Sequence, residues 1–265
     1  MQSFAYQTPA SVADAVQAGA IDGAKYISGG QTLLQSMKLG LIAPDTVIDL
    51  KGVAALKGIR VENGAVVIGA GCTHAEVAAS AEVQQAIPAL ADLAGNIGDR
   101  QVRNLGTLGG SLANNDPAAC YPAAVLGLGA TVHTDRRQLA AEDFFHGLYT
   151  TALEEGEVIT AVSFPIPEKA AWQKFKQPAS RFSLVGVFVA KGAASSGGEV
   201  RVAVTGAGAG GVFRASGLEA KLAADFSAAA LAGATVSADA LNSDLHGSAE
   251  YRAALIPVLA GRAIG

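Results

Sequence analysis

The chain has 265 residues, of which 50% are hydrophobic and 16% charged, and its formal net charge is −4. The 19 lysines and arginines form no basic stripe, which argues against a nucleic-acid-binding protein. The two cysteines, Cys72 and Cys120, are too few for an iron–sulfur cluster or a structural zinc site. No apolar run is long enough to span a bilayer, and residues 1–6 lack the features of a secretion signal. We therefore expect a cytoplasmic protein without a membrane span or a metal site.

The four histidines show no metal-ligand spacing. We expect them at surface or capping positions: His74, His133, His146 and His246.

The first part of the chain alternates short helices and strands. A helix is predicted over residues 11–18, because Ser11 is a good N-cap and an apolar stripe follows it. A strand is predicted over residues 24–27, a helix over residues 32–38 and a further strand over residues 47–50.

The middle part begins with a hairpin signal, because Asn63-Gly64 separates two apolar runs. Thr73 is predicted to cap a helix, and another helix follows over residues 87–94. We interpret residues 96–117, rich in Gly, Asn and Asp, as a long irregular stretch. Beyond it we expect a helix at residues 119–128 and strands at residues 130–133 and 158–164.

Residues 165–171 are the predicted domain boundary, because two prolines end the preceding strand there. Two apolar strands follow it, and the rest of the chain is predicted to be Ala-rich helix. This order of strands and then helices is typical of an α+β domain. The expected elements are strands at 183–191 and 199–205 and helices at 218–224, 228–232 and 249–262.

Two glycine-rich segments with hydroxyl side chains carry the chemistry: Ser28-Gly29-Gly30-Gln31-Thr32 and Thr107-Leu108-Gly109-Gly110-Ser111. Each lies between an apolar run and the expected start of a helix. Glycine lets the backbone approach a phosphate closely, N–H groups can form an anion-binding nest, and hydroxyl groups add hydrogen bonds. Alone, either glycine pair would indicate only a tight turn, but two such segments can converge on the two phosphates of one dinucleotide.

Arg103 and Asp116 flank the second segment. The Arg103 guanidinium could reach a phosphate or hold the segment by donating to its carbonyls. Asp116 could act at the cofactor or simply cap the next helix, which we expect Asp116-Pro117 to open.

Residues 206–211 form a third glycine-rich segment, which resembles the Rossmann fingerprint. No parallel strand–helix–strand unit follows it, so we interpret it as a turn between the last strand and the helices.

Several motifs resemble one family, the FAD-binding medium subunits of the molybdenum hydroxylases, which are relatives of carbon monoxide dehydrogenase and xanthine dehydrogenase. The N-terminal motifs are residues 28–34 (SGGQTLL) with 37–39 (MKL), 101–113 (QVRNLGTLGGSLA) and 116–119 (DPAA). The C-terminal motifs are residues 175–177 (FKQ), 180–181 (SR) and 247–252 (GSAEYR). The resemblance covers nearly the whole chain.

The resemblance implies an α+β fold: a two-subdomain FAD-binding domain (PCMH/vanillyl-alcohol-oxidase-like) and a small α+β C-terminal domain of the CO dehydrogenase flavoprotein type. The implied bounds are 1–55, 56–166 and 172–265. It also implies a heterotrimer, usually paired into a dimer, in which a large subunit holds molybdopterin and a small one holds two [2Fe–2S] clusters. Electrons would pass through the clusters to FAD in this chain and then to an external acceptor.

The resemblance also implies the cofactor-binding residues, and it names no catalytic residue. One side of the diphosphate, near the ring system, would be held by Ile27, Ser28, Gly29, Gly30, Gln31, Thr32 and Leu33. The other side would be held by Thr107, Gly109, Gly110 and Ser111, with Asn114 and Asp116 at the end of that segment. Contacts to the adenine or flavin are implied for Ile97 and Ile159, an approach to the flavin for Lys176 and stacking on the isoalloxazine for Phe182.

Cys120 departs from the family pattern, since many relatives have an acidic residue after Asp-Pro-Ala-Ala. A carboxylate contact to the cofactor is therefore in doubt at this place. Two other hypotheses stay open: a stand-alone FAD-dependent oxidoreductase of the same binding fold, and an assembly protein that has lost its cofactor.

Overall fold

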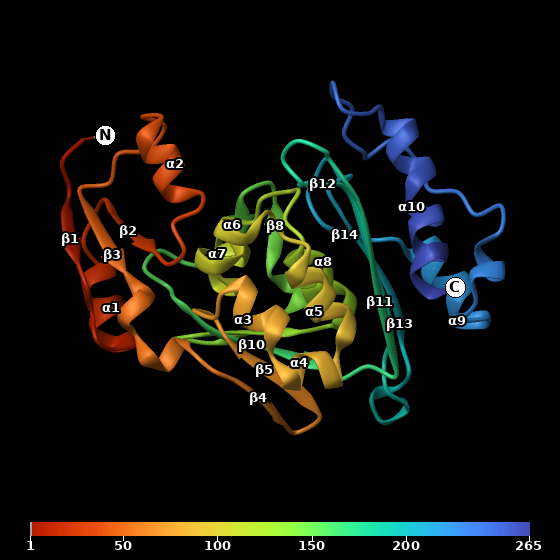
Figure 1. The fold of residues 1–265 in the computed structure, drawn as a ribbon, viewed down its shortest axis with the longest axis horizontal. Helices are drawn as coiled ribbons and strands as arrows, with labels where there is room; N and C mark the ends of the chain where they lie inside the picture. Colours follow the sequence, from red (N-terminus) through yellow and green to blue (C-terminus); the bar gives the residue numbers. More distant parts are fainter. Residues whose placement is uncertain (1) are drawn as a thin grey trace.

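The computed structural model describes residues 2–265, and three main sheets follow one another along the chain (Figure 1). The first sheet is parallel, in the order β1-β3-β2. Its elements are β1 (Ala5–Gln7), α1 (Val12–Gly19), β2 (Ala24–Ile27), α2 (Leu33–Lys38) and β3 (Thr46–Asp49). Two 3-10 turns, Leu50–Gly52 and Ala54–Leu56, lead from it to the second sheet.

The second sheet is antiparallel, in the order β4-β5-β10-β6-β7. Its strands are β4 (Ile59–Glu62), β5 (Ala65–Gly69), β6 (Thr131–Thr134), β7 (Gln138–Ala140) and β10 (Ile159–Pro165). A 3-10 turn (Ala141–Asp143) and the small hairpin β8 (Phe145–Gly147) and β9 (Thr150–Thr151) lie between β7 and β10.

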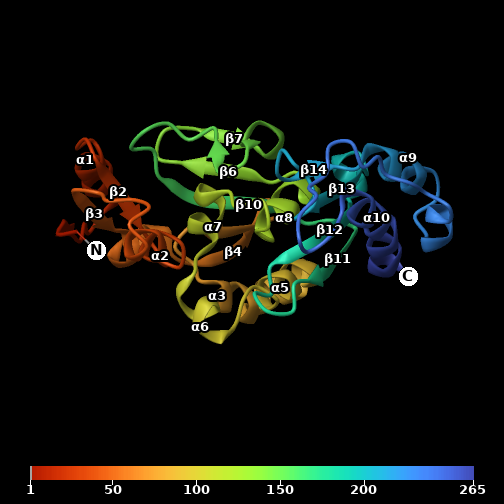
Figure 2. The same ribbon diagram turned by 90° about the horizontal axis from the view of Figure 1, so that it is seen from above.

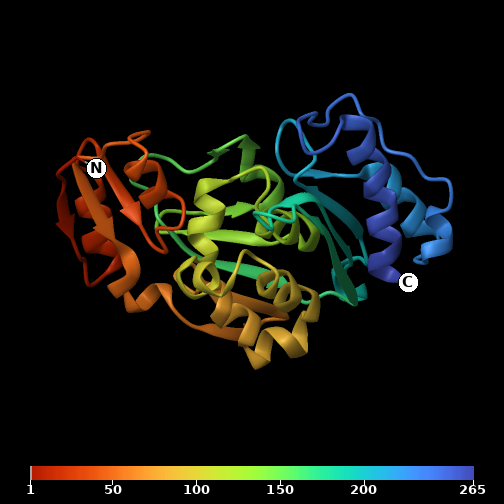
Figure 3. The same ribbon diagram turned by 45° about the horizontal axis from the view of Figure 1, so that its top comes forward.

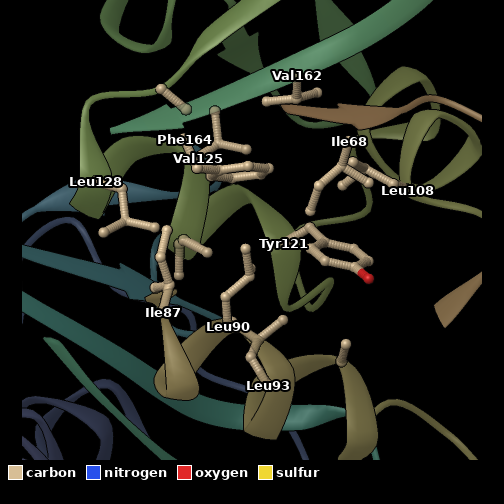
Figure 4. Close-up of a cluster of buried hydrophobic side chains, with 14 of the residues drawn as sticks. Ile68, Ile87, Leu90, Leu93, Leu108, Tyr121, Val125, Leu128, Val162 and Phe164 are labelled. Atoms are coloured by element: carbon tan, nitrogen blue, oxygen red, sulfur yellow. The ribbon is translucent and has the colours of Figure 1, made fainter. Parts of the chain in front are cut away.

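Six short helices lie between β5 and β6 in the sequence and pack beside this sheet (Figure 2). They are α3 (His74–Ala79), α4 (Ala81–Ala86), α5 (Pro88–Gly95), α6 (Arg100–Leu105), α7 (Leu108–Asn114) and α8 (Tyr121–Leu128). Figure 4 shows the core between sheet and helices, where Phe164 and Val162 of β10 face Tyr121 and Val125 of α8. Helix α8 is apolar on every side, which fits its burial between the second and third sheets.

The third sheet is antiparallel, in the order β11-β12-β13-β14. Its strands are β11 (Lys169–Lys176), β12 (Ser183–Lys191), β13 (Val200–Thr205) and β14 (Phe213–Arg214), with a 3-10 turn (Ala194–Ser196) between β12 and β13. One face packs on α5 and α8, and the other is covered by α9 (Ser216–Ala224), a 3-10 helix (Ala228–Leu231) and α10 (Ala249–Ile264) (Figure 3). Strand β12 is therefore buried on both faces, which explains its continuous apolar run. No helix among residues 2–265 is long and apolar enough to cross a membrane.

Several predictions from local sequence signals are confirmed. Ser11 caps α1 by accepting from Asp14 N, and Thr73 forms a capping box with Glu76. Asn63 and Gly64 have positive φ and join β4 to β5. Residues 206–211 connect β13 to the antiparallel strand β14, so no Rossmann unit is formed there.

Three local predictions are wrong, and several elements were not expected. The stretch 96–117, expected to be irregular, contains α6 and α7, because Asp99 and Thr107 act as N-caps. Helix α8 begins at Tyr121, and Asp116 forms a turn by accepting from Ala118 N instead of opening that helix. Helix α4 was not expected, nor were strands β1, β7, β8, β9, β11 and β14, and residues 228–231 form a 3-10 helix where an α-helix was predicted. The 3-10 form there is short, as is usual for this helix type.

Candidate cofactor-binding site

A cavity of about 860 Å³ extends between the first and second sheets and reaches the third. This volume lies within the range of sites that bury a cofactor or drug-sized ligand. All the cofactor-binding residues named from the sequence line the cavity except one, the exposed Lys176.

The first glycine segment, residues 28–32, leaves β2 and leads into α2. Within residues 2–265, the N–H groups of Gly29, Gly30, Gln31 and Thr32 have no protein acceptor. Gly30 has φ +67°, a conformation that favours glycine. Four N–H groups without an acceptor, on residues that line a cavity, are suited to binding a phosphate.

The second segment, by contrast, is the N-terminus of α7. Its first N–H groups are already used: Leu108 N donates to Cys72 O (3.0 Å), Gly109 N to Ala70 O (2.8 Å) and Gly110 N to Thr107 Oγ1 (3.1 Å). This segment therefore does not provide the anion-binding nest that the sequence suggested. What the second segment can offer to a ligand is its hydroxyl groups and a backbone that the ligand can approach closely.

The two segments touch each other directly. Thr107 Oγ1 donates to Ser28 Oγ at 3.0 Å, and a Cβ at Gly29 would lie 2.2 Å from Leu105 O. A Cβ at Gly109 would lie 2.6 Å from the Cβ of Ala70. Glycine is thus required by close backbone approach at both positions, and the cavity walls meet with no space for a larger residue.

Residues 96–98 form a turn between α5 and α6. The carbonyl oxygens of this turn accept hydrogen bonds from cationic side chains. Arg103 Nη1 donates to Ile97 O (3.0 Å) and Gly98 O (3.2 Å), so it fixes this turn and not the second glycine segment, whose carbonyls were the acceptors expected in one alternative. Lys174 Nζ donates to Asn96 O at 3.1 Å and lies 3.3 Å from Cys120 Sγ.

Two carboxylates line the cavity, and both have protein partners. Asp116 Oδ1 accepts from Ala118 N at 2.8 Å, and its Oδ2 lies 3.5 Å from Tyr149 Oη, whose pKa is raised by burial and by this carboxylate. Hydrogen bonds from Arg137 lower the pKa of Glu157 to about 2, and the two groups form an ion pair at 2.8 Å.

His74, the first residue of α3, lines the cavity and is 5% exposed, so the expectation of a surface or capping role is wrong for it. Burial, with a contribution from Arg103, lowers its pKa to about 4, and its Nδ1 has no partner within residues 2–265. A neutral imidazole with an unused nitrogen fits a cavity that holds a polar ligand.

The lining residues that sequence reasoning missed include His74, Lys174, Tyr149 and Arg181. Of these four residues, only His74 had a local sequence signal, because it directly follows the capping residue Thr73. The capping box places its imidazole next to Gly106.

A family model described as the FAD binding domain in molybdopterin dehydrogenase matches residues 2–167. The carbon monoxide dehydrogenase medium chain of Hydrogenophaga pseudoflava is 33% identical over 98% of this chain and 96% of its own length. The nicotine 6-hydroxylase medium subunit of Paenarthrobacter nicotinovorans is 36% identical over 100% of this chain and 97% of its own.

Solved structures agree over the same length. A structure of carbon monoxide dehydrogenase from Hydrogenophaga pseudoflava matches with a TM-score of 0.87 at 33% identity, over 99% of this chain and 96% of that chain. Quinoline 2-oxidoreductase from Pseudomonas putida 86 matches with a TM-score of 0.87 at 30% identity and the same coverage. The chain therefore belongs to the family of FAD-binding medium subunits of the molybdenum hydroxylases.

Proposed function

We propose that this chain binds one FAD in the cavity and serves as the electron-transfer subunit of a molybdenum-containing oxidoreductase. The observation that carries the proposal is the set of four unused N–H groups at residues 29–32, held opposite Thr107 by the hydrogen bond to Ser28. The diphosphate would accept from these groups and from the hydroxyls of Ser28, Thr107 and Ser111, which all line the cavity.

The isoalloxazine ring would lie at the end of the cavity lined by Ile97, Lys174 and Phe182. This end provides an apolar side chain, a cation and an aromatic ring that is 52% exposed. Such a set suits a flavin, which presents a flat apolar face and gains negative charge on reduction. Ile159 would make a further apolar contact, and Asn114 and Asp116 would bind ribose or hold the α7–α8 turn.

The partners are proposed from the relatives, whose names describe them as medium chains or medium subunits of dehydrogenases and hydroxylases. The expected assembly is a heterotrimer with a large molybdopterin-binding subunit and a small subunit carrying two [2Fe–2S] clusters, paired into a dimer of trimers. Bound FAD would take electrons from a cluster and pass them to an external acceptor. The oxidation of substrate would take place in the large subunit.

We also propose that the three sheets mark three units. Residues 1–55 and 56–166 would be the two FAD-binding subdomains, because the cavity lies between their sheets. Residues 172–265 would be a C-terminal domain that contributes Lys174 and the loop with Phe182 to one end of the cavity.

The test is to purify the full chain together with any subunits that accompany it, denature the sample and measure released flavin by visible absorption. One FAD per chain is expected, together with a molybdopterin-type and an iron–sulfur subunit. Absence of flavin would contradict the proposal. Turnover of NAD(P)H or an organic substrate by the isolated chain would instead favour the stand-alone oxidoreductase.

A further inference from the structure

Lys174 is a cavity cation without a carboxylate partner. It projects from β11, is half-buried and lines the cavity. Within residues 2–265, its Nζ has two partners, Asn96 O and Cys120 Sγ, and it forms no ion pair. One of the three donors of this ammonium is therefore still unused.

Within residues 2–265, neither carboxylate of the cavity forms an ion pair with Lys174, and each has other partners. Glu157 is engaged by Arg137, and Asp116 accepts from Ala118 N. A bound ligand that carries a negative charge could therefore pair with Lys174 without competition from these two groups.

The position of Lys174 indicates which part of FAD would supply this charge. Lys174 donates to Asn96 O, and Arg181, next to Phe182 in the chain, lies 3.5 Å from Gly98 O, so both cations reach the same turn. The diphosphate cradle is formed by other elements, where Ser28 meets Thr107. Arg181 is exposed, so solvent screens its charge, whereas the Lys174 ammonium is partly shielded.

We infer that Lys174, unneutralised because its cavity neighbour is the Cys120 thiol, is the residue that stabilises the negative charge of the reduced flavin. The inference rests on the proposed FAD site. Reduction of a flavin by two electrons and one proton leaves one negative charge on its pyrimidine side, and a nearby ammonium makes this reduced state more stable. Lys174 is thus a positioning and tuning residue for electron transfer.

Lys176, to which the family resemblance gave the approach to the flavin, is a matched control on the same strand. Residues two apart on a regular strand share a face, but the pairing of β11 with β12 shifts register between Phe175 and Lys176. Lys176 is exposed and lies outside the cavity lining.

The test compares Lys174→Met, Lys174→Arg and Lys176→Met in the FAD-containing full chain, as purified with its subunits. The readout is the flavin midpoint potential, from equilibrium titration of the flavin absorbance. Lys174→Met should favour the oxidised flavin by about tenfold, equivalent to about 30 mV for a two-electron couple. Lys174→Arg should retain most of the wild-type potential, and Lys176→Met should leave it unchanged.

A second test keeps Lys174 and neutralises its charge with a neighbouring carboxylate. Cys120→Asp places a carboxylate beside Lys174 Nζ, so the potential should shift in the same direction as in Lys174→Met, while the neutral Cys120→Ser should not shift it. If all variants retain FAD and the potential of Lys174→Met and Cys120→Asp equals that of wild type, the inference is overturned. An equal shift in Lys176→Met would also overturn it. A wild-type chain that holds no FAD would contradict the proposed function instead.

Discussion

The two glycine segments are alike in sequence and differ in structure. Residues 28–32 form a loop in which the N–H groups of residues 29–32 stay unused, whereas residues 107–111 form the cap and first turn of α7, with the first N–H groups already bonded. In the first segment, backbone donors without a protein acceptor belong to residues that line the cavity. In the second, Gly109 allows α7 to pack directly against Ala70 at the end of β5.

This difference shows that a glycine pair next to a hydroxyl residue can serve two purposes in one site. One segment supplies hydrogen-bond donors, and the other supplies a rigid wall that positions them. Changes in the first should act mainly on ligand binding, whereas changes in the second should act mainly on stability.

Lowering the pH should separate the two segments most strongly, because His74 is hydrogen-bonded to Gly106, next to the second segment. His74 N donates to Gly106 O, and its imidazole has a pKa of about 4 in the folded chain against 6.5 when unperturbed. The unfolded chain therefore binds more protons between these values, so stability should fall by about 3 kcal/mol as pH drops from 6.5 to 4. Urea unfolding of the FAD-free chain at several pH values measures this slope. His74→Phe should flatten it and His146→Ala, at an exposed position, should not; an unchanged slope in His74→Phe would show that another group is responsible.

Gly29→Ala should damage the first segment. The new Cβ would lie 2.2 Å from Leu105 O and 2.6 Å from Gly106 Cα, backbone atoms that cannot rotate away. The two walls must then separate, at a cost of about 2 to 3 kcal/mol, appearing mainly as an FAD dissociation constant raised about 30- to 140-fold. Flavin fluorescence quenching measures the constant. Gly217→Ala, where nothing lies within 4 Å, is the control, and equal affinities in both variants would disprove the close-approach argument.

Gly109→Ala should act on stability instead. Alanine favours a helix by about 1 kcal/mol over glycine, but its Cβ would meet the Cβ of Ala70 at 2.6 Å and Ala70 O at 2.9 Å. We expect a net loss of about 1 to 2 kcal/mol in the free energy of unfolding, measured with urea. Gly261→Ala in α10, with nothing within 4 Å, should stabilise the chain by up to about 1 kcal/mol. A stabilised Gly109→Ala variant would mean that α7 can move away from β5.

Local sequence signals predicted much of this fold, because the caps and turns that they indicate depend on hydrogen bonds between residues close together in the chain. The caps at Ser11 and Thr73 and the Asn63-Gly64 turn each depend on a few neighbouring residues. The start of α7 was missed because its two glycines disfavour a helix, and packing against Ala70 overrides that preference.

Strand β11 was missed because its three lysines give it a polar composition. It is an edge strand, where lysines are common, and only Trp172 is buried along its length. Without this strand, the sequence could not distinguish Lys174 from Lys176. The register shift that separates them is fixed by pairing with β12, which lies later in the chain.

The hydrogen bond between Ser28 and Thr107 joins the two segments, so its removal tests whether they act together. Thr107→Ala loses the bond to Ser28 and the cap on Gly110 N, and should cost about 1 to 2 kcal/mol of stability. Ser28→Ala loses only the joint bond and should cost about 0.5 to 1 kcal/mol. The double variant should cost less than the sum, because one bond is shared. Thr107→Ser keeps both bonds and is the control. Strictly additive losses in urea unfolding would show that the two segments are energetically independent, and the proposed cradle would then depend on FAD itself to hold its walls together.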